Sequence, residues 1–349
     1  MTNQKGENII MYSKEELLQM STLIRDAATN RVAMFSNETA AKNADEAIRK
    51  FHSEILGGEL DWQSWRNNKN AIFTIWENVL KPELPEAWKT SPFYKRMCEV
   101  RNGAIGEKNA FTVRDKSYLA AAKFSGGTWD VEYQKVGRAK DIAIDTEWSY
   151  VACYEELDRF LKGYTTIVEM LNEVREGFAT DMDNRIATVF NGMGAYLPSQ
   201  FVQQGTYNKD TLVDMIRMVR TANRKNTIVA GSQRAVSKIA EGTNANWISN
   251  AAKDELATSG VVVKNTGIGC DAIIIPDSFI PFTYEFAGAD DTLYVLPDEQ
   301  IIKIFYEGDV RSKEAHEDEE HDQTIRIQFQ HKVGVELVTS DLFGKYTIA

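Results

Sequence analysis

The chain has 349 residues, of which 43% are hydrophobic and 26% charged. This balance excludes a collagen-like, mucin-like or wholly disordered chain and indicates a globular protein with room for about two domains. Its 51 acidic and 40 basic residues give a net charge of −11. That charge argues against a dedicated DNA-binding module, because such modules present a basic face.

The cysteines and the apolar segments bear on compartment and cofactors. Cys98, Cys153 and Cys270 are far apart and form no CxxC pair, which excludes a zinc ribbon or a redox pair. The N-terminus has no apolar run of signal-peptide length, and no segment approaches the roughly 20 apolar residues that span a bilayer. We therefore expect a soluble cytosolic product with reduced thiols, no membrane segment and no cofactor.

The N-terminal part, up to about residue 109, is expected to be mainly helical. One helix begins at Ser13, with Glu16 three residues later in the spacing of a capping box. A second helix is expected at 43–56. Three prolines within 81–92 then indicate an irregular connection.

Strand character dominates from residue 110 to residue 150. Two runs rich in aromatic and β-branched residues, 110–115 and 128–151, lie on either side of Gly126 and Gly127. This pattern predicts a long two-stranded hairpin with a glycine tip. Because an isolated hairpin is only marginally stable, it needs another surface to lie on.

A long amphipathic helix follows within 155–190. Its apolar residues recur every three or four positions over eight turns: Phe160, Tyr164, Ile167, Leu171, Val174, Phe178, Met182, Ile186 and Val189. This period of 3.6 predicts a helix of at least 30 residues, about 45 Å long. Asn191, Gly192 and Gly194 are expected to end it.

Helices and strands alternate in the remainder of the chain. We expect helices at 206–223 (starting at Asn208 or Asp210), 232–242 (capped by Ser232) and 244–260, and strands at 226–232, 261–267, 270–279, 291–297, 300–308 and 322–348. The last segment begins with a clean alternation, with Ile325, Ile327 and Phe329 inward and Arg326, Gln328 and Gln330 outward. The fold class is therefore α+β, with one mixed sheet in this half.

Charge is concentrated in two segments. Residues 307–322 hold eight acids against two bases: Glu307, Asp309, Glu314, Glu317, Asp318, Glu319, Glu320 and Asp322 against Arg311 and Lys313. Residues 108–140 hold seven bases against three acids: Lys108, Arg114, Lys116, Lys123, Lys135, Arg138 and Lys140 against Asp115, Asp130 and Glu132. The second segment is basic and carries interleaved aromatic residues, but its bases are spread over both strands and mixed with acids, which is a weak pattern for nucleic-acid binding.

His316 and His321 are the first candidates for chemistry, because they bracket four successive acids. Their spacing of five points them to different sides of a helix or a strand, and four adjacent carboxylates fit no tetrahedral metal site. The segment lies between two expected strands, so we interpret it as a solvated acidic loop.

Three other candidates are also weak. Cys270 is followed by a strand, which favours a buried thiol over a nucleophile. The Gly231-Ser232 turn resembles a phosphate-binding turn, but it lacks a GxGxxG or P-loop pattern and fits a simple helix cap. Ser232 and His331 could belong to a catalytic triad, yet no GxSxG elbow is present.

The order of elements resembles the major capsid proteins of tailed bacteriophages with the HK97-like fold. The resemblance identifies an N-terminal helical arm (1–109), an extended E-loop hairpin (110–150), a peripheral domain with the long spine helix (151–206), an axial domain (207–306), and an acidic loop with a return strand to the peripheral domain (307–349). It implies self-assembly into pentamers and hexamers of an icosahedral head around double-stranded DNA, without sequence-specific DNA binding. The same resemblance implies portal and scaffolding partners, assembly in the bacterial host cytoplasm and a place in the virion.

Under this resemblance, the two charged segments suggest contacts between subunits. The basic residues Lys116, Lys123, Lys135, Arg138 and Lys140 of one copy are expected to face Glu317, Asp318 and Glu319 of a neighbour, which would steer register more than it adds affinity. No enzyme is expected. The alternatives are an encapsulin-like bacterial compartment shell and, from a different class, a cytosolic α+β hydrolase using Cys270 or Ser232.

Overall fold

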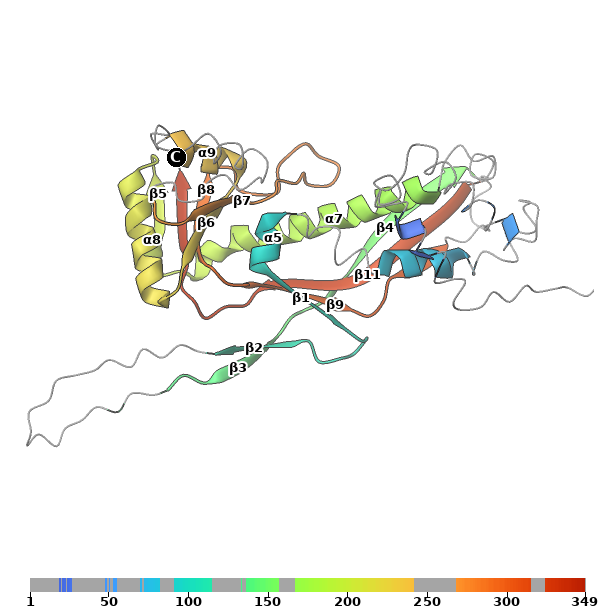
Figure 1. Ribbon diagram of the computed structural model, residues 1–349, viewed down its shortest axis with the longest axis horizontal. Helices are drawn as coiled ribbons and strands as arrows, with labels where there is room; N and C mark the ends of the chain where they lie inside the picture. The colour runs from blue at the N-terminus through green and yellow to red at the C-terminus, as the bar shows by residue number, and fades with distance from the viewer. Residues whose placement is uncertain are drawn as a thin grey trace, which may run out of the picture. The chain divides into compact units, whose positions relative to one another are not determined.

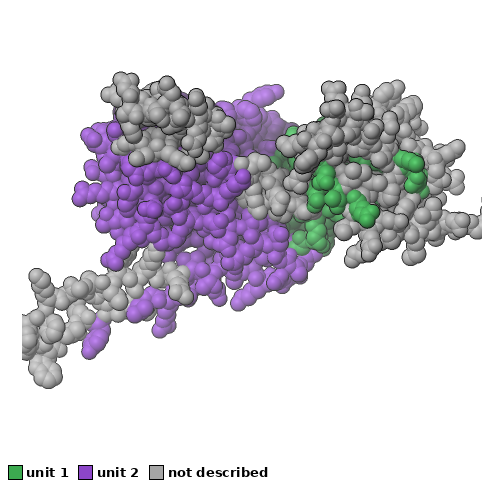
Figure 2. Space-filling view, viewed as in Figure 1, with its two compact units in different colours: residues 1–87, 148–179, 308–332 green, residues 88–147, 180–307, 333–349 purple. Residues whose placement is uncertain are grey.

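A computed structural model of the chain describes residues 91–114, 136–156, 167–241, 268–314 and 324–348, together with residue 133 and helical positions within 19–26, 48–54 and 70–81. The chain divides into two compact units, coloured separately in Figure 2: unit 1 comprises 1–87, 148–179 and 308–332, and unit 2 comprises 88–147, 180–307 and 333–349. The described helices include none that is both long and apolar enough to cross a membrane.

A five-stranded mixed sheet forms the centre of unit 2 (Figure 1). Its order is β5 (Val202–Gly205), β12 (Gly344–Ile348), β8 (Thr292–Pro297), β6 (Thr227–Gly231) and β7 (Asp271–Ile274). The two outer pairs are parallel and the two inner pairs are antiparallel. Every residue of β6 and β8 is buried, which explains why these strands appear in the sequence as continuous apolar runs.

Two helices pack against this sheet, and both begin where the sequence predicts. Helix α8 (Lys209–Asn223) is capped by Asn208, whose side chain accepts the N–H of Asp210 at 2.9 Å. Helix α9 (Gln233–Glu241) starts after Ser232, whose hydroxyl accepts the N–H of Ala235 at 3.1 Å. The apolar stripe of α8 is fully buried against the sheet: Leu212, Met215, Ile216 and Val219.

Unit 2 also contains part of a second sheet, so the prediction of one mixed sheet is wrong. Strand β9 (Ile302–Glu307) pairs in parallel with β1 (Cys98–Gly103) and in antiparallel with residues 333–337 of β11 (Thr324–Leu337). Strand β1 was not expected, because its charged residues hide the apolar alternation. Helix α5 (Pro92–Met97), capped by Ser91, leads directly into it.

Helix α7 (Ile167–Gly192) confirms the predicted stripe from Leu171 to Ile186, whereas Phe160 and Tyr164 lie outside the described residues and Val189 is half-buried. The side chains of Leu171, Val174, Phe178, Met182 and Ile186 are each at most 3% exposed, and Gly192 is the last helical residue as expected. The predicted start is wrong at its first two positions, because Glu155 and Glu156 end strand β4 (Glu147–Glu156), which pairs with β11. Sheet pairing here overrides the helical preference of glutamate.

Unit 1 has its own apolar core. The fully buried ring of Trp76, in a helical segment over 72–81, lies 6.4 Å from the ring of Phe329 on β11. Ile327 and Phe329 are buried while Gln328 is half-buried, as the alternation predicts. A further strand that was not expected, β10 (Arg311–Glu314), pairs with β11 within the acidic segment.

Candidate assembly surface

The base of the predicted hairpin is present in unit 2. Strands β2 (Ala110–Arg114) and β3 (Ala139–Ala143) pair in antiparallel register, from Ala110 opposite Ala143 to Arg114 opposite Ala139. Across this pair the hydroxyl of Thr112 donates to a carboxylate oxygen of Asp141 at 2.7 Å. The glycine pair at 126–127 lies outside the described residues.

An apolar cluster anchors this base to the body of unit 2. Phe111, on β2, is 1% exposed and packs with Ile144, Phe305 and Val338. The guanidinium carbon of Arg101 lies 4.3 Å from the centre of the Phe111 ring, which adds a cation–π attraction. Loss of a buried aromatic ring of this kind costs roughly 3–5 kcal/mol, so the hairpin base is firmly held.

A buried carboxylate, Glu307, ties the two ends of the hairpin together. It is the last residue of β9 and is 8% exposed. Its Oε1 accepts the N–H of Gly106, before β2, at 3.0 Å, and its Oε2 accepts the hydroxyl of Thr146, after β3, at 2.6 Å. The sequence places Glu307 in an expected strand and in the acidic stretch 307–322, but it does not identify the two hydrogen-bond partners of this residue.

Close approach of the chain beside β3 requires a glycine on β11. A Cβ atom added to Gly334 would lie 2.4 Å from the carbonyl oxygen of Asp145 and 2.6 Å from a methyl group of Ile144. The backbone N–H of Asp145 also donates to Glu336 of β11 at 3.3 Å. The segment after β3 is therefore seated directly on β11.

Of the residues predicted to make contacts between subunits, the structure describes two. Arg138 and Lys140 are exposed beside and on β3, where they can meet another molecule. The remaining predicted contact residues lie outside the described residues: Lys116, Lys123, Lys135, Glu317, Asp318 and Glu319. His316 and His321 also lie outside them, so the expected charge complement stays a prediction.

The three residues considered as catalytic candidates, Cys270, Ser232 and His331, are each engaged in packing or hydrogen bonding within the fold. Cys270 is 7% exposed just before β7, and burial raises the pKa of its thiol to about 12. The Ser232 hydroxyl caps α9 and donates to the carbonyl of Asp290. His331 belongs to unit 1, where its ring packs edge-on against Phe178 at 4.4 Å between centroids.

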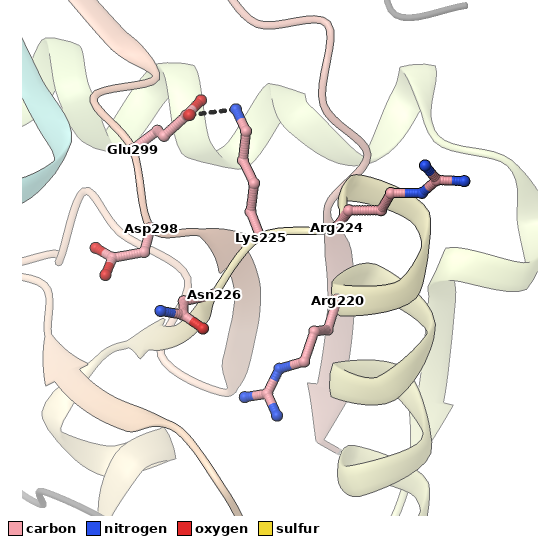
Figure 3. Close-up of a pocket in the computed structure, with 6 residues that line it drawn as sticks. All are labelled: Arg220, Arg224, Lys225, Asn226, Asp298 and Glu299. Carbon is pink, nitrogen blue, oxygen red and sulfur yellow. Dashed lines mark ion pairs between the residues drawn. The ribbon is translucent and has the colours of Figure 1, made fainter. Parts of the chain in front are cut away.

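An open pocket of about 480 Å³ lies in unit 2 and is lined by Arg220, Arg224, Lys225, Asn226, Asp298 and Glu299 (Figure 3). Its carboxylates are already paired within the chain. Lys225 pairs with Glu299, and Arg96 holds Asp298 through two contacts of 2.6 Å, which lowers the pKa of Asp298. The two lining arginines point away from each other (Figure 3), so these groups do not converge on a small ligand.

Comparison with known proteins matches residues 19–347 to a family described as "SPbeta prophage-derived putative capsid protein YonB". No curated protein matches the sequence.

Similar solved structures include the capsid of the cyanophage P-SCSP1u, with 14% identity, 74% of this chain and 88% of the other covered, and a TM-score of 0.47. The capsid of an empty GTA particle is also similar (12% identity, 73% and 96% covered, TM-score 0.47). A third is the procapsid of satellite phage P4 (9% identity, 76% and 89% covered, TM-score 0.47).

Proposed function

This chain belongs to the YonB family of prophage-derived capsid proteins, and we propose that its copies assemble into pentamers and hexamers of an icosahedral head that encloses double-stranded DNA. The family match confirms the capsid function predicted from the sequence and favours it over an encapsulin-like shell. The role of a capsid protein is structural rather than catalytic.

The observation that carries the assembly proposal is the anchored hairpin base. Phe111 packs β2 against the rest of unit 2, and Glu307 binds the segments just before β2 and just after β3, while Arg138 and Lys140 remain exposed. A two-stranded extension of this length gains little stability by itself. We propose that it lies across a neighbouring copy, where it finds the surface that it needs.

We propose that attraction between opposite charges on the two copies sets the register of that contact. Lys116, Lys123, Lys135, Arg138 and Lys140 would face Glu317, Asp318 and Glu319 of the neighbour. Opposed charges of this kind steer encounter and orientation, and their effect weakens as salt screens them.

The proposed assembly as a phage head also implies particular partners and a particular place of assembly. Portal and scaffolding proteins would be partners, and assembly would take place in the bacterial host cytoplasm before the protein enters the virion. The net charge of −11 suits a lining over which packaged DNA moves without being gripped.

Electron microscopy of the purified full-length protein tests the assembly proposal. We expect closed particles of megadalton mass. A protein that stays monomeric by sedimentation at all concentrations tested, with and without a co-expressed scaffold, would contradict it.

The triple variant Glu317→Lys, Asp318→Lys and Glu319→Lys tests the charge complement. We expect fewer complete particles at low salt and a smaller defect at high salt, where the wild-type attraction is screened as well. Unchanged assembly at both salt concentrations would overturn the proposed register while leaving the capsid role intact.

A further inference from the structure

A short hairpin after β7 exposes a group of large apolar side chains in unit 2. Its exposed members are Phe279 (46%), Ile280 (42%), Phe282 (108%), Tyr284 (94%) and Phe286 (49%). Single exposed apolar residues are common, but a contiguous group marks an interaction surface.

This hairpin is an ordered element. The N–H of Ile280 donates to the carbonyl of Glu285, and the N–H of Ala287 donates to the carbonyl of Ser278, both at 2.9 Å. The side chain of Asn191, at the end of α7, donates to the same Ala287 residue at 2.9 Å. The backbone that carries the exposed rings is therefore fixed before any partner arrives, which lowers the entropy lost on binding.

The tip residue Phe282 occupies a position that favours glycine. Pro281 and Phe282 are the central residues of a turn closed by the N–H of Thr283 and the carbonyl of Ile280 at 3.0 Å. Phe282 has a φ of 63°, and a positive φ at the second central residue is the type II pattern, in which glycine is usual. The fold keeps a strained, fully exposed aromatic ring at this tip, as expected where the strain serves an interaction.

The chemistry of the hairpin defines the surface that would receive it. Between residues 278 and 287 the only charged side chain is that of Glu285. A matching surface needs apolar contact for the rings and positive charge, because arginine both attracts a carboxylate and stacks on aromatic faces.

The exposed face of α8 offers this combination. Arg217 and Arg220 lie three residues apart on one side of the helix, and Met218, 37% exposed, lies beside Arg217. Arg220 also donates to the carbonyl of Gly269 at 2.7 Å, and exposed Arg224 follows as the C-cap of the helix. Methionine adapts its shape to aromatic partners.

We propose that the 278–287 hairpin of one copy docks on the Arg217–Arg224 face of α8 of the next copy. This contact rests on the proposed self-assembly and adds to it a specific pair of surfaces, joined by aromatic insertion and by attraction between Glu285 and the arginines. Figure 1 shows α8 on one side of the β5–β12–β8–β6–β7 sheet and the orange segment after β7 on the other. One copy can thus use both surfaces at once, and a repeated head-to-tail contact forms a ring when the rotation between successive copies closes.

Paired cysteines test the contact directly. Tyr284→Cys and Met218→Cys are placed in the same full-length chain, and assembled protein is oxidised mildly and run on a non-reducing gel. We expect a ladder that extends beyond dimers, and mainly monomer for each single variant and for the wild type. A ladder that stops at dimers, or the same products from one single variant, would indicate a two-fold contact and overturn the head-to-tail arrangement; an absence of disulfides would overturn the contact.

A second set of variants separates this contact from folding. Phe282→Gly relieves the strained turn, so we expect equal or higher thermal stability of the subunit and a rise of at least about tenfold in the concentration required for assembly. Arg217→Glu and Glu285→Arg should each weaken assembly, and their combination should restore it. If the wild type forms particles and Phe282→Gly forms them equally well, the docking inference fails and the capsid role stands; if the wild type forms none, the proposed function itself fails.

Discussion

The carboxylates of Asp183 and Glu307, both in unit 2, differ in their hydrogen bonds. Glu307 accepts hydrogen bonds at both ends of a hairpin. Asp183, on α7, accepts the hydroxyl of Tyr94 at 2.5 Å, yet burial raises its pKa from 3.8 to about 6. The raised pKa of Asp183 means that its protonated form is less costly to the fold than its charged form.

Asp183→Asn is expected to change the pH dependence of stability. Between pH 3.8 and about 6 the folded chain holds a proton that the unfolded chain has lost, so the free energy of unfolding falls as the pH rises through that range and stays lower above it. Asparagine can still accept from Tyr94 without a charge. Denaturant melts should show the variant more stable than the wild type by on the order of 1–2 kcal/mol at pH 7.5 and nearly equal to it at pH 4; an equal difference at both pH values would contradict this.

Glu307→Ala is expected to lower the free energy of unfolding by about 2 kcal/mol, since hydrogen bonds to a charged group are lost at Gly106 and Thr146. Glu107→Ala is the matched control, because Glu107 is exposed and accepts only one described backbone N–H, that of Ala104. Urea unfolding of both variants measures the difference. Equal effects would show that burial of Glu307 adds nothing.

The three thiols are expected to be slow toward a thiol reagent in the native chain at pH 7. Burial raises the pKa of Cys270 to about 12 and that of Cys153 to about 11, and Cys98 is 6% exposed. In denaturant all three should react at the normal rate, which serves as the control. Rapid native modification of Cys270 would revive the hydrolase alternative.

Individual helices and strands were predictable where local pattern and tertiary packing agree. The caps Asn208 and Ser232 and the apolar stripe of α7 carry their information within a few residues. Strands β1 and β10 were missed because they are specified by partners far along the chain, and the start of α7 was misplaced for the same reason. Pairing partners of this kind cannot be identified from local propensity.

The candidate surface was predictable in outline only. The hairpin and its exposed bases at Arg138 and Lys140 follow from the pattern of residues. The hydrogen bonds of Glu307 to Gly106 and Thr146 do not follow from that pattern, because these partners lie far from Glu307 in the sequence. The left-handed turn at Phe282 does not follow either, because no glycine marks it.

Gly334→Ala tests how closely β11 approaches the segment after β3. The added methyl group would lie 2.4 Å from a backbone oxygen, so the strand must shift, at a cost of roughly 1–3 kcal/mol. Gly288→Ala is the control, because an added Cβ there meets nothing within 4 Å. Thermal melts should separate the two variants, and equal melting temperatures would rule out the tight contact.

At the scale of the whole molecule, net charge is the property that bears on packaged DNA. With a charge of −11, free subunits should retain little double-stranded DNA at physiological salt, because binding of this kind depends on neutralised phosphates. Replacing Glu317, Asp318 and Glu319 with lysine adds two charges at each position and brings the net charge to −5. A mobility-shift assay should show stronger retention by that variant at low salt; strong retention by the wild type at physiological salt would contradict the expectation.

The two hydrogen bonds accepted by Glu307 also have a consequence for engineering. Both ends of the β2–β3 hairpin are fixed on one side chain at the end of β9, so the length of chain between the two strands can change without disturbing the body. A foreign peptide could therefore be grafted between residues 114 and 139 with the subunit still able to fold. Because this segment is proposed to lie across a neighbouring copy, such a graft would change the assembly of the particle while the subunit itself still folds.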